Sequence, residues 1–175
     1  MKKNLVFIAF SLLLLLVSNS ALSQLDKIYL HNGKQIEGTV MRVDGFVVVF
    51  KYNGEDAEQV SSKYAVKKII YKSGREEEIS DKIMIGGKED WEKVVLLENV
   101  SQISGLIKVS EIKGKTAMIN YRSNSGSEKA AMKKLKETAA ELGCPFILLT
   151  SDRETTRNFG FGGSQDQKRG IAYKY

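Results

Sequence analysis

Residues that could carry out chemistry are scarce in this 175-residue chain. It contains one His, His31, and one Cys, Cys144. A structural zinc site needs about four Cys or His ligands, and a nucleophilic Cys-His pair would require these two residues to meet. A Cys/His zinc site within one chain is therefore excluded, and so is an internal disulfide.

We expect neither residue to be catalytic. His31 precedes Asn32-Gly33, a turn signal, so we expect a solvated turn residue with no acidic or nucleophilic neighbour to make it a general base. Cys144 lies between an expected helix end and an expected buried strand, where a free cysteine behaves as a small apolar residue. The alternative for Cys144 is a reactive thiol or an intermolecular disulfide in an oxidising compartment.

Two acidic groups, Glu76-Glu77-Glu78 and Glu55-Asp56, raise the question of paired carboxylates or a calcium site. Glycosidases hold two carboxyl groups about 5–10 Å apart in a cleft, and nothing in the sequence indicates a cleft. No Asp-Xaa-Asp-Xaa-Asp-Gly calcium loop is present either. We interpret these residues as a solvated acidic strand edge that opposes aggregation.

The segment 158–164, Asn-Phe-Gly-Phe-Gly-Gly-Ser, is the strongest candidate for binding. Its glycines do not open a helix, which disfavours a phosphate site. Aromatic and Arg side chains dominate binding hot spots, so we predict partner contacts at Arg157, Asn158, Phe159 and Phe161, with Arg153 nearby. The alternative is a mobile connector between two strands.

The N-terminus has the pattern of a secretory signal peptide over residues 1–23. Lys2 and Lys3 precede an apolar run over 5–17, and Ala21-Leu22-Ser23 offers small residues for cleavage between Ser23 and Gln24. A membrane anchor is the alternative, but a spanning helix needs about 20 apolar residues. We therefore expect an exported chain with no membrane span after signal removal.

The charge balance gives little support to a nucleic-acid partner. The chain carries a net charge of +6, which becomes +4 without Lys2 and Lys3, and the surplus lies in residues 86–175. Phosphate binding requires clustered cations, whereas these cations are dispersed among acidic residues. We expect no nucleic-acid partner.

Residues 24–83 predict a small all-β module. Asn-Gly, Asp-Gly and Ser-Gly pairs recur at steady intervals and favour hairpin turns. The predicted strands cover residues 27–30, 35–43, 46–52, 57–60, 67–71 and 75–79. Val47 and Val49 are apolar on the face opposite Val48 and Phe50, so we expect this strand to be covered on both sides. Short antiparallel strands of this kind predict an SH3-like or Sm-like barrel.

This stretch also resembles a module of exported proteins from Bacteroidetes-type bacteria. The matching motifs are Asn32-Gly33-Lys34, Ile36-Glu37-Gly38-Thr39-Val40 and Ile69-Ile70-Tyr71-Lys72-Ser73-Gly74. They are mostly turn and core positions, so the resemblance implies a fold and not a function.

A linker over 84–91 precedes a second predicted domain over 92–175, an α+β sandwich with one main helix. We predict strands over 93–98, 106–112, 116–121, 146–150 and 170–175, with a hairpin around Gly114. The helix begins at a capping box of Ser125 and Glu128 and ends at Gly143, before Pro145. Its apolar face carries Met132, Leu135, Ala139 and Leu142, and its solvated arc carries Lys129, Lys133, Lys136, Glu137 and Glu141.

The second half resembles RcsF-like and YbjQ-like envelope domains. The resemblance lies in residues 130–150, with Ala-Ala-Glu-Leu-Gly-Cys-Pro leading into an apolar strand, and in the final Gly170-Ile171-Ala172-Tyr173. It implies a stress-sensing role. RcsF-type sensors carry paired disulfide cysteines and a lipid anchor, and this chain has neither.

Together these features predict an exported protein, periplasmic or secreted, that binds an envelope protein or a glycan and is not an enzyme. One alternative is an envelope stress sensor or regulatory adaptor, as the RcsF-like resemblance implies. Another is an uncharacterised hydrolase, which is disfavoured because no nucleophile, base and orienting group can be assembled. No metal or cofactor is expected.

Overall fold

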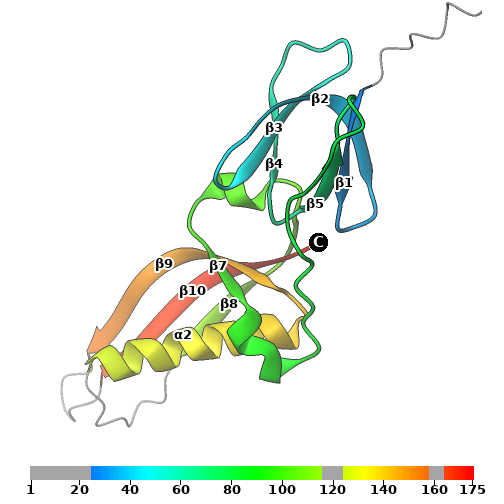
Figure 1. The fold of residues 1–175 in the computed structure, drawn as a ribbon. Coiled ribbons are helices and arrows are strands. Elements are labelled where there is room, and N and C mark those ends of the chain that lie inside the picture. Colours follow the sequence, from blue (N-terminus) through cyan, green and yellow to red (C-terminus); the bar gives the residue numbers. More distant parts are fainter. Residues whose placement is uncertain (1–24, 116–123, 158–163) are drawn as a thin grey trace, which may run out of the picture.

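The computed structural model describes residues 25–115, 124–157 and 164–175, which form two sheets and one long helix (Figure 1). This confirms the predicted α+β class. The predicted cleavage site at Ser23 and Gln24 lies outside the described residues, as does the strand predicted over 116–121. None of the helices in the described ranges combines the length and apolar character needed to cross a bilayer.

The first sheet has six antiparallel strands in the order β4-β3-β2-β1-β5-β6. They are β1 (Asp26–Leu30), β2 (Gln35–Val43), β3 (Val47–Tyr52), β4 (Gln59–Ser62), β5 (Val66–Ile70) and β6 (Glu76–Glu78). Gly33, Gly54 and Gly74 take positive φ in the tight turns, as the Asn-Gly and Ser-Gly pairs predict. One face of the sheet buries Ile28, Leu30, Val48, Phe50, Val66 and Ile69. Val49 is buried as well, as expected of a strand covered on both sides.

The first sheet is not closed by hydrogen bonds. Among the described residues no pairing joins β4 to β6, so both remain edge strands and no closed barrel is found. The buried carboxylate of Asp26 connects β1 to two other segments of the first half. Asp26 accepts hydrogen bonds from the backbone N–H of Val40 in β2 and of Lys72 after β5, both at 2.7 Å.

The second sheet has the order β7-β9-β10-β8, with β7 parallel to β9 and the other pairs antiparallel. A 3-10 helix, η2 (Lys88–Lys93), leads into β7 (Val95–Leu97), and a second, η3 (Val100–Ile103), leads into β8 (Ile107–Lys115). The helix α2 (Asn124–Glu141), β9 (Phe146–Arg157) and β10 (Ser164–Lys174) complete this half. The predicted hairpin around Gly114 is wrong, because Gly114 lies inside β8 and pairs with Lys168 of β10.

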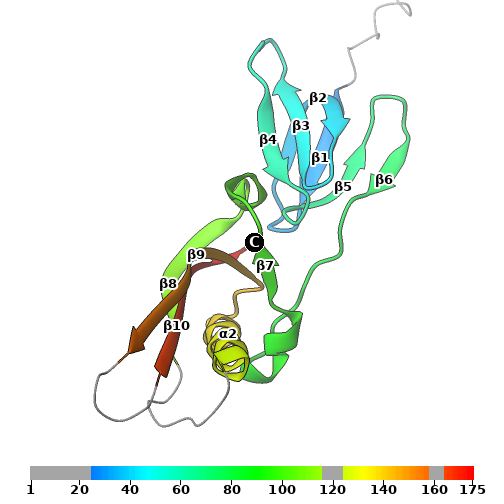
Figure 2. The same cartoon turned by 90° about the vertical axis from the view of Figure 1, so that its left-hand side faces the viewer.

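Helix α2 packs across one face of this sheet (Figures 1 and 2). Leu135 and Ala139 are fully buried, whereas Leu142 is exposed and follows the helix, so it was wrongly placed on the apolar face. Glu137, predicted to be solvated, is buried and paired with Lys134 at 2.8 Å. The helix begins at Asn124, one residue before the predicted capping residue Ser125, whose side chain lies outside the described part of the chain.

The end of α2 confirms the predicted stop at Gly143. Gly143 has φ 65°, and its N–H donates to the carbonyl of Ala140. The N–H of Cys144 donates to the carbonyl of Ala139 at 2.9 Å. This pair of bonds is a Schellman motif, in which glycine adopts the left-handed conformation at low cost.

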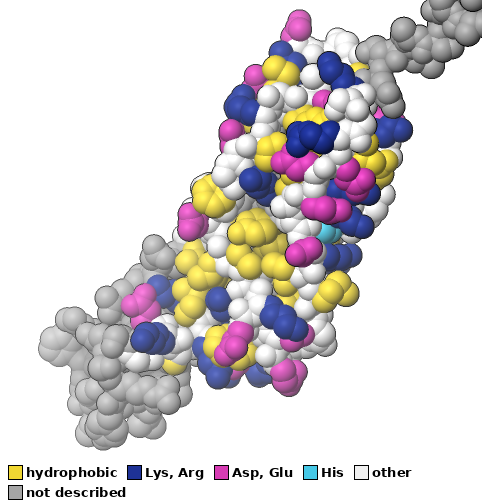
Figure 3. All heavy atoms as spheres, viewed as in Figure 1, with side chains coloured by type: hydrophobic (Ala, Val, Ile, Leu, Met, Phe, Trp, Pro, Cys, Tyr) yellow, Lys and Arg dark blue, Asp and Glu magenta, His cyan; other side chains and the backbone are white. Residues whose placement is uncertain are grey.

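The two sheets meet through a shared apolar cluster. It combines Leu97, Phe146 and Tyr173 with side chains from the first half and its exit segment, among them Tyr64 and Ile83. Ser62 N–H also donates to the carbonyl of Ser104 at 2.8 Å, which joins the β4 edge to the segment after η3. Figure 3 shows hydrophobic side chains gathered midway along the molecule, at the level where the sheets meet.

Candidate functional site

The predicted binding residues fall at the end of β9 and in the segment after it. Arg157 is the last residue of β9, and only its backbone is described. Asn158, Phe159 and Phe161 lie outside the described residues. The binding role of this segment therefore stays a prediction, and the site must be sought elsewhere.

His31 is in the expected turn, but it is not a freely solvated side chain. Its Nε2 lies 3.0 Å from the hydroxyl of Ser80, and its ring packs edge-on against the ring of Tyr175. Burial lowers the pKa of His31 below its ordinary value, and the nearby Lys82 and Lys67 act in the same direction. The sequence hid both partners because they lie 49 and 144 residues away.

The His31–Ser80 pair does not have the arrangement of a nucleophile and its base. The Ser80 hydroxyl lies 2.9 Å from the carbonyl oxygen of Lys63 and 2.8 Å from that of Val66. The hydroxyl has a single hydrogen. The two carbonyl oxygens compete with His31 Nε2 to accept it. A general base requires that hydrogen to point at the imidazole. The pair instead ties the turn after β1 to the segment after β6.

Cys144 is a buried core residue, as predicted. It is fully buried beside Leu135, Ala139 and Ile147, and it forms no disulfide. Burial raises the pKa of its thiol. The thiolate, which is the reactive form, is therefore disfavoured in the folded protein.

The acidic run Glu76–Glu78 forms the edge strand β6, as its interpretation as an acidic edge requires. Glu77 accepts a hydrogen bond from the hydroxyl of Tyr71 at 2.8 Å and pairs with Arg75 at 2.9 Å. These bonds lower the pKa of Glu77, the Tyr71 hydrogen bond most of all. Within the described residues no cluster of three His, Cys, Asp or Glu side chains could hold a metal.

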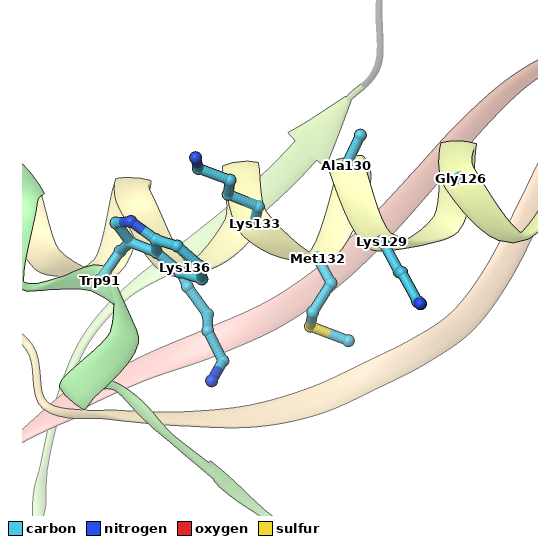
Figure 4. A pocket seen from close by; sticks show the side chains of 7 residues that line it. All are labelled: Trp91, Gly126, Lys129, Ala130, Met132, Lys133 and Lys136. Atoms are coloured by element: carbon cyan, nitrogen blue, oxygen red, sulfur yellow. The ribbon is translucent and has the colours of Figure 1, made fainter. Parts of the chain in front are cut away.

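A groove between η2 and α2 is the best candidate for a ligand site (Figure 4). Its volume is about 620 Å³. The lining comprises Trp91 of η2 and six residues of α2: Gly126, Lys129, Ala130, Met132, Lys133 and Lys136. Trp91 and Met132 are partly buried and pack against the core beneath the helix, so the floor of the groove is fixed to the second sheet.

Three lysines give the groove its charge. Figure 4 shows Lys129, Met132 and Lys136 extending along one side of α2, with Lys133 near Trp91. The Nζ of Lys133 lies 4.8 Å from the centre of the Trp91 ring, within cation–π range. In the described parts of the chain, no carboxylate forms an ion pair with any of these three lysines.

The nearby carboxylates are engaged by other lysines. Glu137 pairs with Lys134 at 2.8 Å and lies 3.8 Å from Lys88, and Glu141 pairs with Lys88 at 3.0 Å. These contacts lower the pKa of Glu137, with Lys134 as the main cause. The groove therefore combines an apolar floor with lysines that form no ion pair with these carboxylates, although Lys133 also helps to lower the pKa of Glu137.

The chain was compared with protein-family models, curated proteins and solved structures. None of these comparisons gave a match. The resemblances to the Bacteroidetes-type module and to RcsF-like domains therefore stay predictions.

Sequence reasoning missed this groove because it assigned the lysines to a solvated helix face. Lys129, Lys133 and Lys136 recur at spacings of four and three, which places them on one arc around Met132. The recurrence of three lysines on one arc is the signal that could have pointed to an anion, although Glu137 stands four residues after Lys133 on the same helix. Trp91 of η2 lines the same groove as Met132, and sequence spacing alone does not place it there.

Proposed function

We propose that this chain is an exported, non-enzymatic binding protein of the bacterial cell envelope. The observation that carries the proposal is the groove of about 620 Å³ between Trp91 and α2. Small-molecule sites commonly measure about 300–1,000 Å³ and combine apolar walls with a few polar groups. The groove has this character, with Trp91 and Met132 as its apolar floor and lysine ammonium groups as its polar groups.

The export part of the proposal rests on the leader-like residues 1–23, and places the chain in the periplasm or outside the cell. Within this proposal the first sheet is an SH3-like or Sm-like module, as six short antiparallel strands joined mostly by tight hairpins suggest. In that compartment the partner of the protein would be an envelope component. An envelope protein or a glycan was the class expected from the sequence.

The non-enzymatic part of the proposal rests on the structural roles of the side chains that could have been catalytic. The Ser80 hydroxyl lies within hydrogen-bond distance of two backbone carbonyls, and Cys144 is buried. The groove itself offers lysines but no carboxylate or hydroxyl among its lining side chains that could act with them as a general acid or base. Binding is what this set of side chains can do.

Native mass spectrometry of the exported chain, after incubation with an organic extract of bacterial envelopes, tests the proposal. We expect a retained small molecule with the unaltered chain. Met132→Glu places a carboxylate on the groove floor and should abolish retention. Met84→Ala, at an exposed position away from the groove lining, should leave retention unchanged.

Circular dichroism of each variant shows whether it is folded. A retained mass that Met132→Glu does not reduce would contradict the proposal, and so would the absence of any retained mass with the unaltered chain.

A further inference from the structure

We infer that the groove takes a free, single-chain amphiphile with an anionic head, of the kind that a long-chain fatty acid represents. The inference deepens the proposed function and rests on it, since it names the ligand class of the same groove. It follows from two properties of the lining, its apolar surface and its positive charge.

The first property is that the walls and floor are apolar. Trp91, Met132 and Ala130 line the groove, and no side-chain hydroxyl, amide or carboxylate joins them. A glycan would bring many hydroxyl groups to a surface with few partners for them, which is costly when they are desolvated. A hydrocarbon chain has no such cost, and the flexible Met132 can adapt its shape to it.

The second property is charge complementarity. Lys129 and Lys133 are four residues apart on α2, and Lys133 and Lys136 are three apart. Like charges at these spacings repel one another, and the neighbouring Glu137 and Glu141 are paired with Lys88 and Lys134. An anionic head bound beside these ammonium groups would relieve this repulsion. A neutral or cationic head would not.

The occupant is a free molecule and not a membrane surface. Helices that lie on bilayers present a broad apolar face to the lipid. The apolar face of α2 is already used, because Ala131, Leu135 and Ala139 are fully buried against the second sheet. What α2 offers outward is a hollow beside Trp91, which suits a single chain.

Trp91 makes the inference directly measurable, because it is the one Trp of the whole sequence. Its emission therefore reports the groove alone. We expect dodecanoate, below its micellar concentration, to change this emission with saturation. Acetate should have no effect, and dodecanol should bind about fivefold more weakly, which corresponds to about 1 kcal/mol, the upper end for one ion pair with an exposed lysine. Shortening the acid should weaken binding about fourfold per methylene.

Three charge-removing substitutions test the lysines. The combination Lys129→Gln, Lys133→Gln and Lys136→Gln should reduce the affinity for dodecanoate to that for dodecanol. Lys134→Gln is the control for each single substitution, since it also removes one positive charge from α2 but at a residue that pairs with Glu137 and does not line the groove. Isothermal titration calorimetry repeats each comparison, because Lys133→Gln also removes the contact with the Trp91 ring.

The outcomes separate the inference from the proposed function. Equal binding of dodecanoate and dodecanol, or an unchanged affinity in the triple variant, would overturn the anionic head. Binding to vesicles of phosphatidylglycerol without binding to dodecanoate would overturn the free amphiphile. In either case, a retained envelope component that Met132→Glu removes would leave the proposed function standing. If no envelope component is retained, or if Met132→Glu does not reduce its retention, the proposed function itself is contradicted.

Discussion

The ring of His31 meets the ring of Tyr175 edge-on, with the centroids 5.0 Å apart and the planes at 65°. His31 belongs to the turn after β1, and Tyr175 follows β10, so the contact joins the first sheet to the second. Tyr175 also packs against Phe146 at 5.3 Å, and its hydroxyl accepts a hydrogen bond from the N–H of Ile83 at 2.8 Å. One side chain thus contacts the first sheet, the connecting segment and the second sheet.

Substitution of Tyr175 should measure how strongly this contact stabilises the fold. Tyr175→Phe removes the hydrogen bond to Ile83 and should lower the free energy of unfolding by about 1 kcal/mol. Tyr175→Ala also removes the ring and should cost about 2–3 kcal/mol, less than a fully buried aromatic. Urea denaturation followed by circular dichroism measures both values. Equal effects of the two variants would show that the ring contacts contribute nothing.

The stability of the protein should depend on pH through His31. Burial holds the pKa of His31 below its ordinary value of about 6.5, so the unfolded chain binds a proton more readily than the folded one. The contribution is therefore fully present above about pH 6.5. It decreases as the pH falls and is lost once the pH has passed below the folded pKa.

The measurement is urea denaturation between about pH 5 and pH 8, where carboxylates stay ionised. His31 is the one His of the sequence, so His31→Gln should remove the slope over this interval. A slope that persists in His31→Gln would assign the effect to another group.

Local signals in the sequence predicted most of the first sheet. The strand over 35–43 has the predicted bounds, because an Asn-Gly turn and an Asp-Gly turn frame it. The end of α2 was equally predictable, since Gly143 and Pro145 act on their immediate neighbours. Such features depend on residues a few positions apart, and a single sequence contains them in full.

The features that sequence reasoning got wrong depend on distant residues. Gly114 looked like a turn because glycine favours turns, yet it is needed inside β8 for the close approach of α2. Glu137 looked solvated, but it is buried and lies 3.8 Å from Lys88, which precedes it by 49 residues. The groove depends in the same way on Trp91, which lies 41 residues before Met132 in the sequence.

Gly114 should tolerate no side chain. A Cβ at this position would overlap the carbonyl oxygen of Ala131 and lie 2.6 Å from the backbone nitrogen of Leu135. Since helix backbone cannot move away cheaply, Gly114→Ala should destabilise the protein by about 2–3 kcal/mol. Gly45→Ala is the control, because a Cβ there meets nothing within 4 Å, and it should change stability by less than about 0.5 kcal/mol. Similar unfolding midpoints for the two variants would contradict the close packing of α2 on β8.

Cys144 should react only when the protein unfolds. It is fully buried, and burial raises the pKa of its thiol, so both access and thiolate content are low in the folded state. For a domain of ordinary stability, we expect alkylation by iodoacetamide to be at least about a thousandfold slower in native buffer than in concentrated guanidinium chloride. Mass spectrometry counts the modified chains, and Cys144 is the one thiol that can be modified. Comparable rates in the two conditions would support the reactive-thiol alternative, because a core cysteine is reached only through opening of the helix end and the strand that enclose it.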